Sequence, residues 1–159
     1  STHFYAVRRK YNHRNRGDGI VVTKIYTDGS SLGNPGAGGW GVVIIYPDGS
    51  EKELSGGEEH TTNNRMEIRA AIEGLAALPP GTIAEVFSDS EYVVNTMAKG
   101  WKMKANTDLW YELMGMDNSV ISRLGDIKWT WVRGHNGDHY NERADCLARA
   151  AAELIKEAE

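Results

Sequence analysis

The first third of the chain alternates short apolar runs with turn-forming segments. β-Branched and aromatic residues dominate 21–27 and 41–46, and the turn signal at 47–49 leads into a third candidate run over 51–57. Runs of this kind, separated by segments rich in Gly or Pro, are typical of strands. Because short connections join antiparallel neighbours, the pattern predicts a three-stranded antiparallel meander.

Apolar residues take up helical spacing after residue 62. They recur at roughly every third or fourth position between Met66 and Leu78, and Thr62 offers a cap in front of them. The Pro-Pro-Gly sequence at 79–81 ends the run, because proline cannot continue a helix. The remaining predicted elements are a strand at 83–87, helices at 91–98 and 107–124, a strand at 127–132 and a helix at 141–156.

The resulting order of elements, βββαβααβα, predicts the fold class. A meander followed by alternating helices and strands is typical of an α/β (α+β) protein whose five-stranded mixed sheet is flanked by helices. The chain has 159 residues, close to the usual size of one domain, and shows neither an internal repeat nor a linker. We therefore expect one folded domain over 21–159, preceded by a basic arm over 1–20 with little regular structure.

Charge is distributed unevenly along the chain. Its 18 basic and 22 acidic residues give a net charge of −4, whereas proteins that bind nucleic acids are usually basic. Residues 1–17, however, contain five Lys or Arg and no acid, and Lys99, Lys102 and Lys104 form a second basic spot. The arm has two interpretations that the sequence leaves open, a solvated tail and a set of phosphate contacts.

Two features of composition limit the class of protein. No apolar run is long enough to span a bilayer, and no hydrophobic signal segment opens the chain. The single cysteine, Cys146, cannot form an internal disulfide, which fits a reducing compartment. We expect a monomeric cytoplasmic protein without membrane association.

Four acidic residues stand in distinctive local contexts. Asp28 and Asp89 end predicted strands, and Glu67 and Asp145 lie on predicted helices. Carboxylates that meet at one edge of a sheet repel one another unless cations neutralise them, and such oxygen ligands suit Mg²⁺ or Mn²⁺. The pattern predicts a metal-dependent enzyme that acts on a phosphate ester. Taken singly, each acid also has a structural explanation, such as a turn, an exposed helix position or a pair between Asp145 and Arg149.

Six segments around these acids complete the pattern. They are Tyr26-Thr27-Asp28-Gly29-Ser30, Gly33-Asn34-Pro35-Gly36, Thr61-Thr62-Asn63-Asn64-Arg65-Met66-Glu67, Asp89-Ser90-Glu91-Tyr92, Trp131-Val132-Arg133-Gly134-His135 and Asn141-Glu142-Arg143-Ala144-Asp145. Together, and in this order, they resemble type 1 ribonuclease H over about residues 22–152. The resemblance implies the ribonuclease H fold and an endonuclease that hydrolyses the RNA strand of an RNA–DNA hybrid.

The resemblance also implies a role for each acid and for one histidine. Asp28, Glu67, Asp89 and Asp145 match the family's metal ligands, with two Mg²⁺ ions bound beside the substrate and Mn²⁺ as a substitute. Such a pair of ions activates water on one side of a phosphodiester and stabilises the leaving oxygen on the other. His135 matches a loop histidine that moves protons or assists product release, a task that suits an imidazole at neutral pH.

Ten further residues are assigned to substrate binding by the same resemblance. They are Ser31, Gly33, Asn34, Thr62, Asn63, Asn64, Glu91, Trp101, Asn106 and Asn141. Amide side chains offer donors and acceptors to the minor groove and the RNA 2′-hydroxyl, and Thr62 and Asn106 match a pocket for a DNA phosphate. Helix capping and turn formation also explain the polar members of this set.

The tryptophans divide between core and surface. We expect Trp110, Trp129 and Trp131 to pack in the core, because one lies within a helix and two lie on a strand beside a helix. Trp101 is the one candidate for the substrate channel, where an aromatic ring stacks on bases.

The segment 92–106 departs from the family pattern. It is too short for the basic protrusion that many family members carry, and Glu91 and His60 stand where Gln and Arg are common. Positive charge near the substrate is therefore reduced, which bears on hybrid affinity rather than on the chemistry.

Two other functions stay open at this point. Integrases, transposases and junction resolvases share the arrangement of carboxylates, although none of their additional DNA-binding segments is found in this sequence. A hybrid-binding module without catalysis is the second alternative, and the four intact carboxylates disfavour it.

Overall fold

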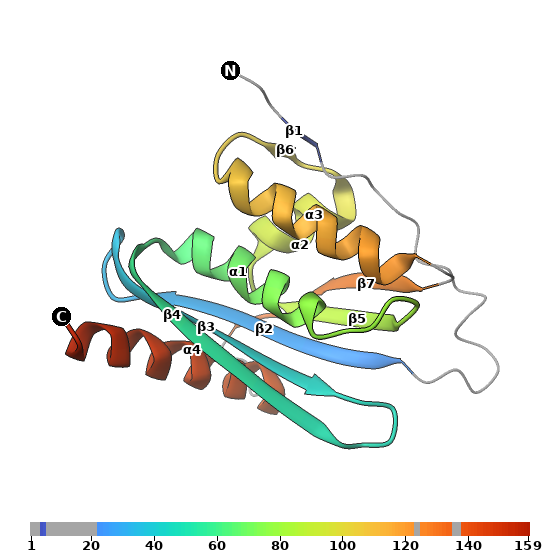
Figure 1. Ribbon diagram of the computed structural model, residues 1–159, viewed down its shortest axis with the longest axis horizontal. Helices are drawn as coiled ribbons and strands as arrows, with labels where there is room; N and C mark the ends of the chain where they lie inside the picture. The colour runs from blue at the N-terminus through green and yellow to red at the C-terminus, as the bar shows by residue number, and fades with distance from the viewer. Residues whose placement is uncertain (1–3, 6–21, 123–124, 135–137) are drawn as a thin grey trace.

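The computed structural model describes residues 4–5, 22–122, 125–134 and 138–159, and its centre is a mixed β-sheet (Figure 1). The strands of this sheet are β2 (Thr23–Ser31), β3 (Gly36–Ile45), β4 (Glu51–Thr61), β5 (Ile83–Ser88) and β7 (Asp126–Trp131). They lie in the order β4-β3-β2-β5-β7. The first three pair antiparallel, and β5 pairs parallel with both β2 and β7. The predicted five-stranded mixed sheet is confirmed.

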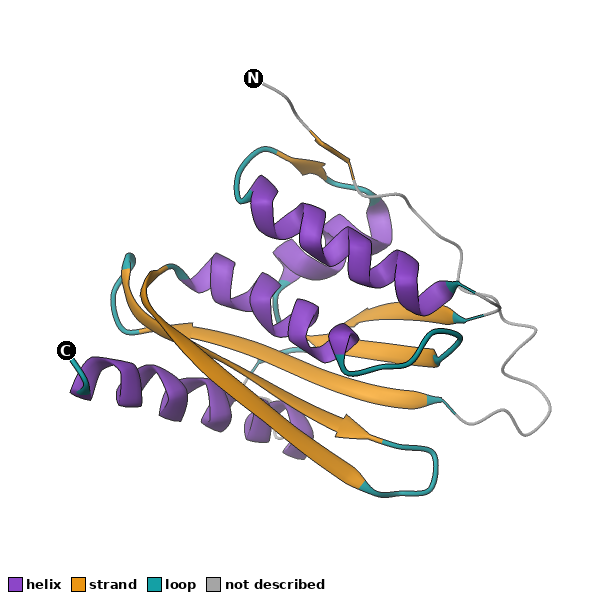
Figure 2. Ribbon diagram, in the orientation of Figure 1, coloured by secondary structure: helices purple, strands orange, loops and turns teal. Residues whose placement is uncertain are grey.

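Helices cover both faces of the sheet (Figure 2). They are α1 (Asn63–Ala76), α2 (Glu91–Lys99), α3 (Thr107–Ile121) and α4 (His139–Glu157). The first three lie on one face, where α1 packs on β2 and β3, whereas α4 packs on the other face against β3, β2 and β4. Within the described ranges, none of these helices has the length and apolar character that crossing a membrane would need.

A second, smaller sheet was not predicted. The two-residue strands β1 (Phe4–Tyr5) and β6 (Lys102–Met103) pair antiparallel, with Tyr5 opposite Lys102. The start of the basic arm therefore lies beside the second basic spot. The rest of the arm, 1–3 and 6–20, lies outside the described residues, as does residue 21.

The first hairpin corrects the predicted strand boundaries. Asp28 does not end its strand, because β2 continues to Ser31 and pairs Asp28 with Gly41 of β3. A glycine of β3 serves close packing. A Cβ on Gly39 would lie 2.6 Å from the backbone nitrogen of Ala152, so the missing side chain lets α4 approach the sheet.

The boundaries of α1 and α2 are close to the prediction, whereas those of α3 and α4 differ from it. Thr62 caps α1 as expected, since its hydroxyl accepts a hydrogen bond from the Arg65 backbone N–H at 3.2 Å. The last helix begins at His139 rather than at Asn141, because Asp138 is the capping residue. Its carboxylate accepts from the Asn141 backbone N–H at 2.9 Å. The helix α3 ends at Ile121, because the capping residue Ser122 has left the helical conformation, so the predicted end at 124 is too late.

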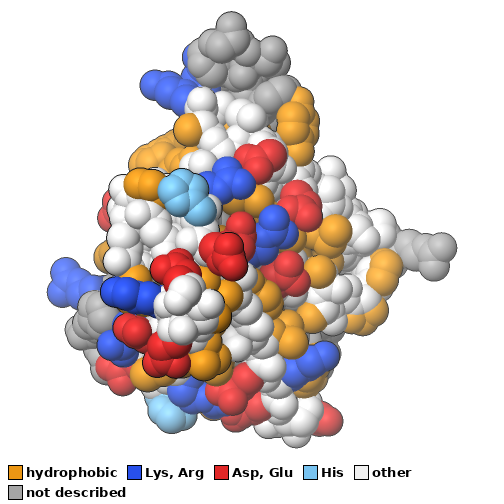
Figure 3. Space-filling model, turned by 60° about the vertical axis from the view of Figure 1, so that its left-hand side comes forward, with side chains coloured by type: hydrophobic (Ala, Val, Ile, Leu, Met, Phe, Trp, Pro, Cys, Tyr) orange, Lys and Arg blue, Asp and Glu red, His pale blue; other side chains and the backbone are white. Residues whose placement is uncertain are grey.

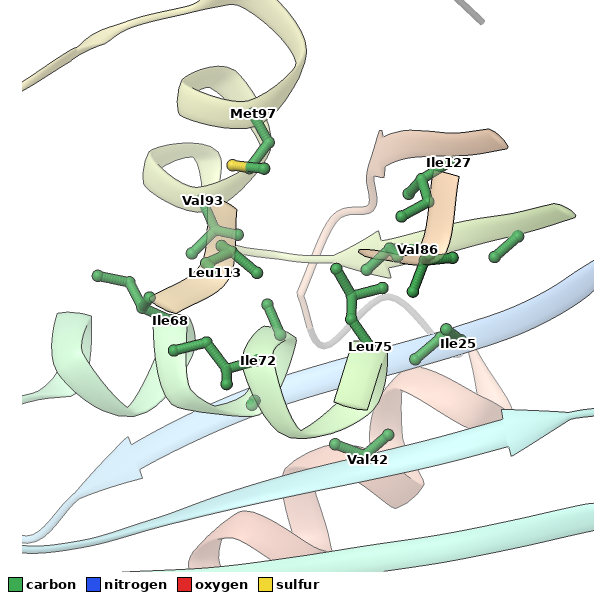
Figure 4. Packing of buried hydrophobic residues seen from close by; sticks show 14 of the residues in the cluster. Ile25, Val42, Ile68, Ile72, Leu75, Val86, Val93, Met97, Leu113 and Ile127 are labelled. Carbon is green, nitrogen blue, oxygen red and sulfur yellow. The ribbon is translucent and has the colours of Figure 1, made fainter. Parts of the chain in front are cut away.

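The main core lies between the sheet and α1–α3. Apolar side chains from both layers interdigitate there, as Figure 4 shows for Ile25, Val42, Ile68, Ile72, Leu75, Val86, Val93, Met97, Leu113 and Ile127. Burial of this apolar surface supplies the main favourable term in folding.

Two of the three tryptophans expected in the core are found there. Trp110 is fully buried, and its indole N–H donates to the Tyr92 hydroxyl at 3.0 Å. Trp129 is partly buried against the same cluster. The prediction is wrong for Trp131, which is 44% exposed at the end of β7, beyond the region that the core helices cover.

The close approach of α4 to β3 predicts the effect of one substitution. Gly39→Ala places a methyl group against the α4 backbone, and overpacking of this kind costs about 1–3 kcal/mol of unfolding free energy. Urea denaturation of the purified variant measures the loss.

Gly115→Ala is the matched control, because a Cβ at this position in α3 meets no atom within 4 Å. Alanine is the better helix former, so the control variant should gain about 0.5–1 kcal/mol. Equal stability of the Gly39→Ala variant and the wild type would contradict the packing described for α4.

Candidate active site

Three carboxylates from different elements meet at one edge of the sheet. Asp28 of β2, Glu67 of α1 and Asp89, which follows β5, each offer an oxygen, and these atoms lie within 4.8 Å of one another. The register explains two of the positions, because Thr27 pairs with Ser88 in the parallel β2–β5 ladder and the acids follow next in each chain segment. The structure thus brings together three of the four acids singled out in the sequence.

Glu67 reaches this edge because α1 lies directly on β2. The contact point is Gly29, where a Cβ would stand 2.8 Å from the Met66 carbonyl oxygen. Any side chain at this position would push the first turns of α1 away from the strand. The Asp-Gly sequence therefore places the Asp28 carboxylate on β2, and its glycine lets α1 bring the Glu67 carboxylate close to it.

Burial and mutual repulsion shift the titration of the cluster. Loss of hydration, followed by the charge of Asp89, raises the pKa of Asp28 from its ordinary 3.8 to about 8. Burial first and the charge of Asp28 second raise the pKa of Glu67 well above its usual range. Without cations, the folded protein therefore retains protons that free carboxyl groups would release.

The donor set fits a divalent metal. The Oε2 atom of Glu67 is buried and has no hydrogen-bond partner among the described residues, although such an oxygen normally requires one. Carboxylate oxygens are the ligands that Mg²⁺ and Mn²⁺ prefer. A bound cation would satisfy this oxygen and would replace the protons that the cluster otherwise holds.

Asp145 lies at the margin of the cluster. It forms an ion pair with Arg149 one helical turn further along α4, with 2.9 Å between Oδ2 and Nη2. After burial and the charge of Asp89, the carboxylate of Asp145 also contributes to the raised pKa of Asp28. The pairing with Arg149 that was considered for Asp145 is therefore observed. The same carboxylate also affects the titration of the cluster.

A rim of polar side chains connects the β2–β3 turn to α1. The side-chain oxygen of Asn34 accepts a hydrogen bond from the Asn63 backbone N–H at 3.1 Å. Ser31 also bonds to the Gly33 carbonyl within the same turn. Asn63 and Asn64 are exposed beyond the Thr62 cap. Six of the predicted substrate residues therefore lie along this connection: Ser31, Gly33, Asn34, Thr62, Asn63 and Asn64.

The start of α3 joins this rim through an arginine. Arg65 donates to Asn106 at 3.3 Å and forms a bidentate pair with Asp108 at 3.0 and 2.7 Å. Asn106 adopts the left-handed conformation, with a φ of 58°. These contacts fix Asn106 close to the N-terminus of α1, where Thr62 also lies.

The other predicted site residues are more scattered. Glu91 begins α2 on the surface, and Trp101, which is 46% exposed, stands between α2 and β6. Asn141 is only 2% exposed, so the structure places it inside the protein rather than with the exposed set. His135 lies outside the described residues. On the face shown in Figure 3, acidic and basic side chains are interspersed with apolar and uncharged ones.

Sequence reasoning missed two residues that contact Asp89. The Trp131 indole N–H donates to the Asp89 carbonyl oxygen at 3.1 Å, and Gly134 lies against the Asp89 carboxylate. Side chains of β7 alternate between its two faces, and this pattern could not distinguish Trp129, which packs against the core, from Trp131, which is exposed. Only the pairing of Trp131 with Ser88, the last residue of β5, shows that its ring lies beside Asp89, and no local sequence signal reveals this pairing.

The raised pKa of Asp28 predicts how stability depends on pH without metal. Because its folded value of about 8 exceeds the ordinary 3.8, this group stabilises the fold fully below about pH 4, and that stability is lost as the pH rises through 8. Asp28→Asn removes the repulsion and should stabilise the metal-free protein at pH 9 by something on the order of 1 kcal/mol.

Urea denaturation at pH 5 and pH 9 in a chelator checks this expectation. The advantage of the variant over the wild type should be larger at pH 9. A variant that is less stable than the wild type at pH 9 would show that the carboxylates do not repel one another in the native protein.

Comparison with known proteins agrees with this geometry. The family model of RNase H matches residues 21–153. A ribonuclease H of Erythrobacter litoralis is 48% identical, with 82% of this chain and 96% of the relative covered, and ribonuclease HI of Pseudomonas aeruginosa is 49% identical, with 82% and 93% covered.

Solved structures show the same fold. The N-terminal RNase H domain from Mycobacterium tuberculosis, solved as a fusion with maltose-binding protein, has a TM-score of 0.74 at 30% identity and covers 87% of this chain and 98% of its own. LC11-RNase H1, solved in complex with an RNA/DNA hybrid, has a TM-score of 0.72 at 29% identity, with 84% and 99% covered. The chain therefore belongs to the RNase H family, whose members are hydrolases that cut the RNA strand of RNA–DNA hybrids.

Proposed function

We propose that this chain is a Mg²⁺-dependent endonuclease that cleaves the RNA strand of RNA–DNA hybrids with two metal ions. The observation that carries the proposal is the meeting of Asp28, Glu67 and Asp89 within 4.8 Å, in a chain of the RNase H family. Two of these acids are buried, and acids so close together remain ionised only beside cations. Mn²⁺ has the same preference for oxygen ligands and would substitute.

The chain's own side chains would divide the work of holding the metal. Asp28, Glu67 and Asp89 would be the central ligands, and Asp145 would complete the set from α4, where Arg149 now shares its carboxylate. When bound, two divalent ions activate the attacking water and stabilise the leaving oxygen of a phosphodiester. We assign His135 to proton transfer or product release after cleavage.

The polar rim would recognise the hybrid. Asn34, Asn63 and Asn64 present amide groups beside the acidic cluster, and amides suit minor-groove edges and the 2′-hydroxyl that marks RNA. Thr62 and Asn106 would receive a phosphate of the DNA strand. The complex of LC11-RNase H1 with an RNA/DNA hybrid supports this class of substrate.

Three further roles belong to the same proposal. Ser31, Gly33 and Glu91 would face the hybrid beside the rim, and the exposed ring of Trp101 would stack in its channel. Asn141 would contribute only after a shift of its buried side chain. We also propose a monomer that acts in the cytoplasm, in line with the lone Cys146.

Neutralising one central ligand should stop the reaction. Asp89→Asn is expected to reduce kcat on a hybrid more than tenfold in Mg²⁺, because a lost ligand raises the barrier by several kcal/mol. Asp48→Asn is the matched control, since Asp48 lies exposed in the β3–β4 turn. Circular dichroism confirms that both variants are folded.

Parallel assays on hybrid, duplex RNA and duplex DNA identify the substrate. Cleavage of the hybrid alone is the expected result. Strand transfer on duplex DNA would favour an integrase-like enzyme instead, and binding without any product would favour a silent hybrid-binding module. A kcat of the Asp89→Asn variant above about a tenth of the wild-type value would reject the metal site.

The basic arm should contribute to hybrid affinity. Its start pairs with β6 beside Lys102 and Lys104, and residues 1–17 carry five Lys or Arg and no acid. We expect deletion of 1–17 to raise KM and to leave kcat at saturation nearly unchanged. Each lost phosphate contact should reduce the slope of log K against log salt by about 0.7–0.9. Equal salt slopes and KM values would make the arm a solvated tail.

A further inference from the structure

The end of β7 is attached to the residue that carries the third carboxylate. Trp131 is the last residue of β7 and lies opposite Ser88 of β5. Its indole N–H donates to the Asp89 carbonyl oxygen at 3.1 Å, and the Val132 backbone N–H donates to the Ser88 carbonyl at 2.9 Å. Two consecutive carbonyl groups at the end of β5 are therefore held from the neighbouring strand, one of them by a side chain.

The segment after β7 also touches the Asp89 carboxylate itself. A Cβ on Gly134 would stand 2.7 Å from Asp89 Oδ2 and 3.5 Å from Asp89 Cβ. There is consequently no room for a side chain at 134 unless the carboxylate turns away. Trp131 holds the backbone of Asp89, and the absence of a side chain at Gly134 leaves the space in which the carboxylate lies.

The packing of β7 indicates that this contact, rather than the core, determines the position of Trp131. Ile127 and Trp129 alternate on the face that packs against the main core, and Trp131 follows on that face beyond it. At 44% exposure, its ring gains less from burial than a core tryptophan does. Its N–H nevertheless has a specific acceptor, as the N–H of a buried tryptophan usually does.

We propose that Trp131 and Gly134 are positioning residues that hold Asp89 in the orientation that metal binding requires. The proposal rests on the proposed function, in which Asp89 is a metal ligand. Partners behind a ligand fix its orientation, and their loss typically lowers metal affinity or activity about 10–100-fold. Neither residue need touch the substrate or the metal.

Trp131→Phe tests the indole contact, because it keeps an aromatic ring and removes the N–H donor. Calorimetric titration of Mn²⁺ into the free protein should give a dissociation constant about tenfold higher than that of the wild type. The Mg²⁺ concentration for half-maximal cleavage should rise by a similar factor. The melting temperature in a chelator and KM for the hybrid at saturating Mg²⁺ should stay unchanged.

Tyr111→Phe is the matched control. Tyr111 is an exposed aromatic residue on α3, and the change removes one polar hydrogen without altering the ring. Its Mn²⁺ affinity should equal that of the wild type. Gly134→Ala supplies an independent variant, since it crowds the carboxylate and leaves the indole contact in place, and it should also weaken Mn²⁺ binding.

The outcomes separate this proposal from the proposed function. Unchanged Mn²⁺ affinity in either folded variant overturns the positioning role. If KM for the hybrid is raised in Trp131→Phe while its Mn²⁺ affinity is unchanged, Trp131 contacts the hybrid instead. If Trp131→Phe fails to fold, the result for Gly134→Ala decides. Asp89→Asn, titrated in parallel, tests the metal site itself, because wild-type affinity in that variant would reject the site and not only its support.

Discussion

The repulsion among Asp28, Glu67 and Asp89 is the constraint on which the site depends. Three acids within 4.8 Å are unfavourable in a metal-free protein, and the surrounding elements keep them there. The parallel β2–β5 ladder fixes Asp28 and Asp89, and contact of α1 with Gly29 fixes Glu67. The apolar core between the sheet and α1–α3 offsets the cost, so Asp28 and Glu67 lie on rigid elements and Asp89 directly follows one.

The sequence predicted the sheet, the main helices and the acids that meet, because period, capping and turn signals are local. The features that the sequence did not predict depend on packing between residues far apart in the chain. Gly39 permits contact with a helix more than 100 residues away, and no local signal shows that β3 begins at Gly36 rather than at the predicted residue 41. Asp138 competes with Asn141 for the cap of α4, and only the three-dimensional backbone shows which one accepts the hydrogen bond.

Some residues of the candidate site could be predicted from the sequence and others could not. Motifs around Asp28, Glu67 and Asp89 are distinctive, whereas support from Trp131 depends on where β5 ends beside β7. The pair between Asp145 and Arg149 involves a carboxylate that the proposed function assigns to the metal. In the proposed function α1 serves both chemistry and substrate recognition, because it carries Glu67 as well as Asn63 and Asn64, whereas Asn34 lies in the β2–β3 turn.

The position of β4 at the open edge of the sheet has a consequence for association between molecules. An unpaired strand edge can pair with the same edge of another chain and begin aggregation. Glu51, Lys52 and Glu53 place charges along this strand, and Arg143 of α4 bonds to both glutamates. A second copy that approached this edge would have to remove water from these charged groups. The energetic cost of doing so opposes aggregation at high protein concentration.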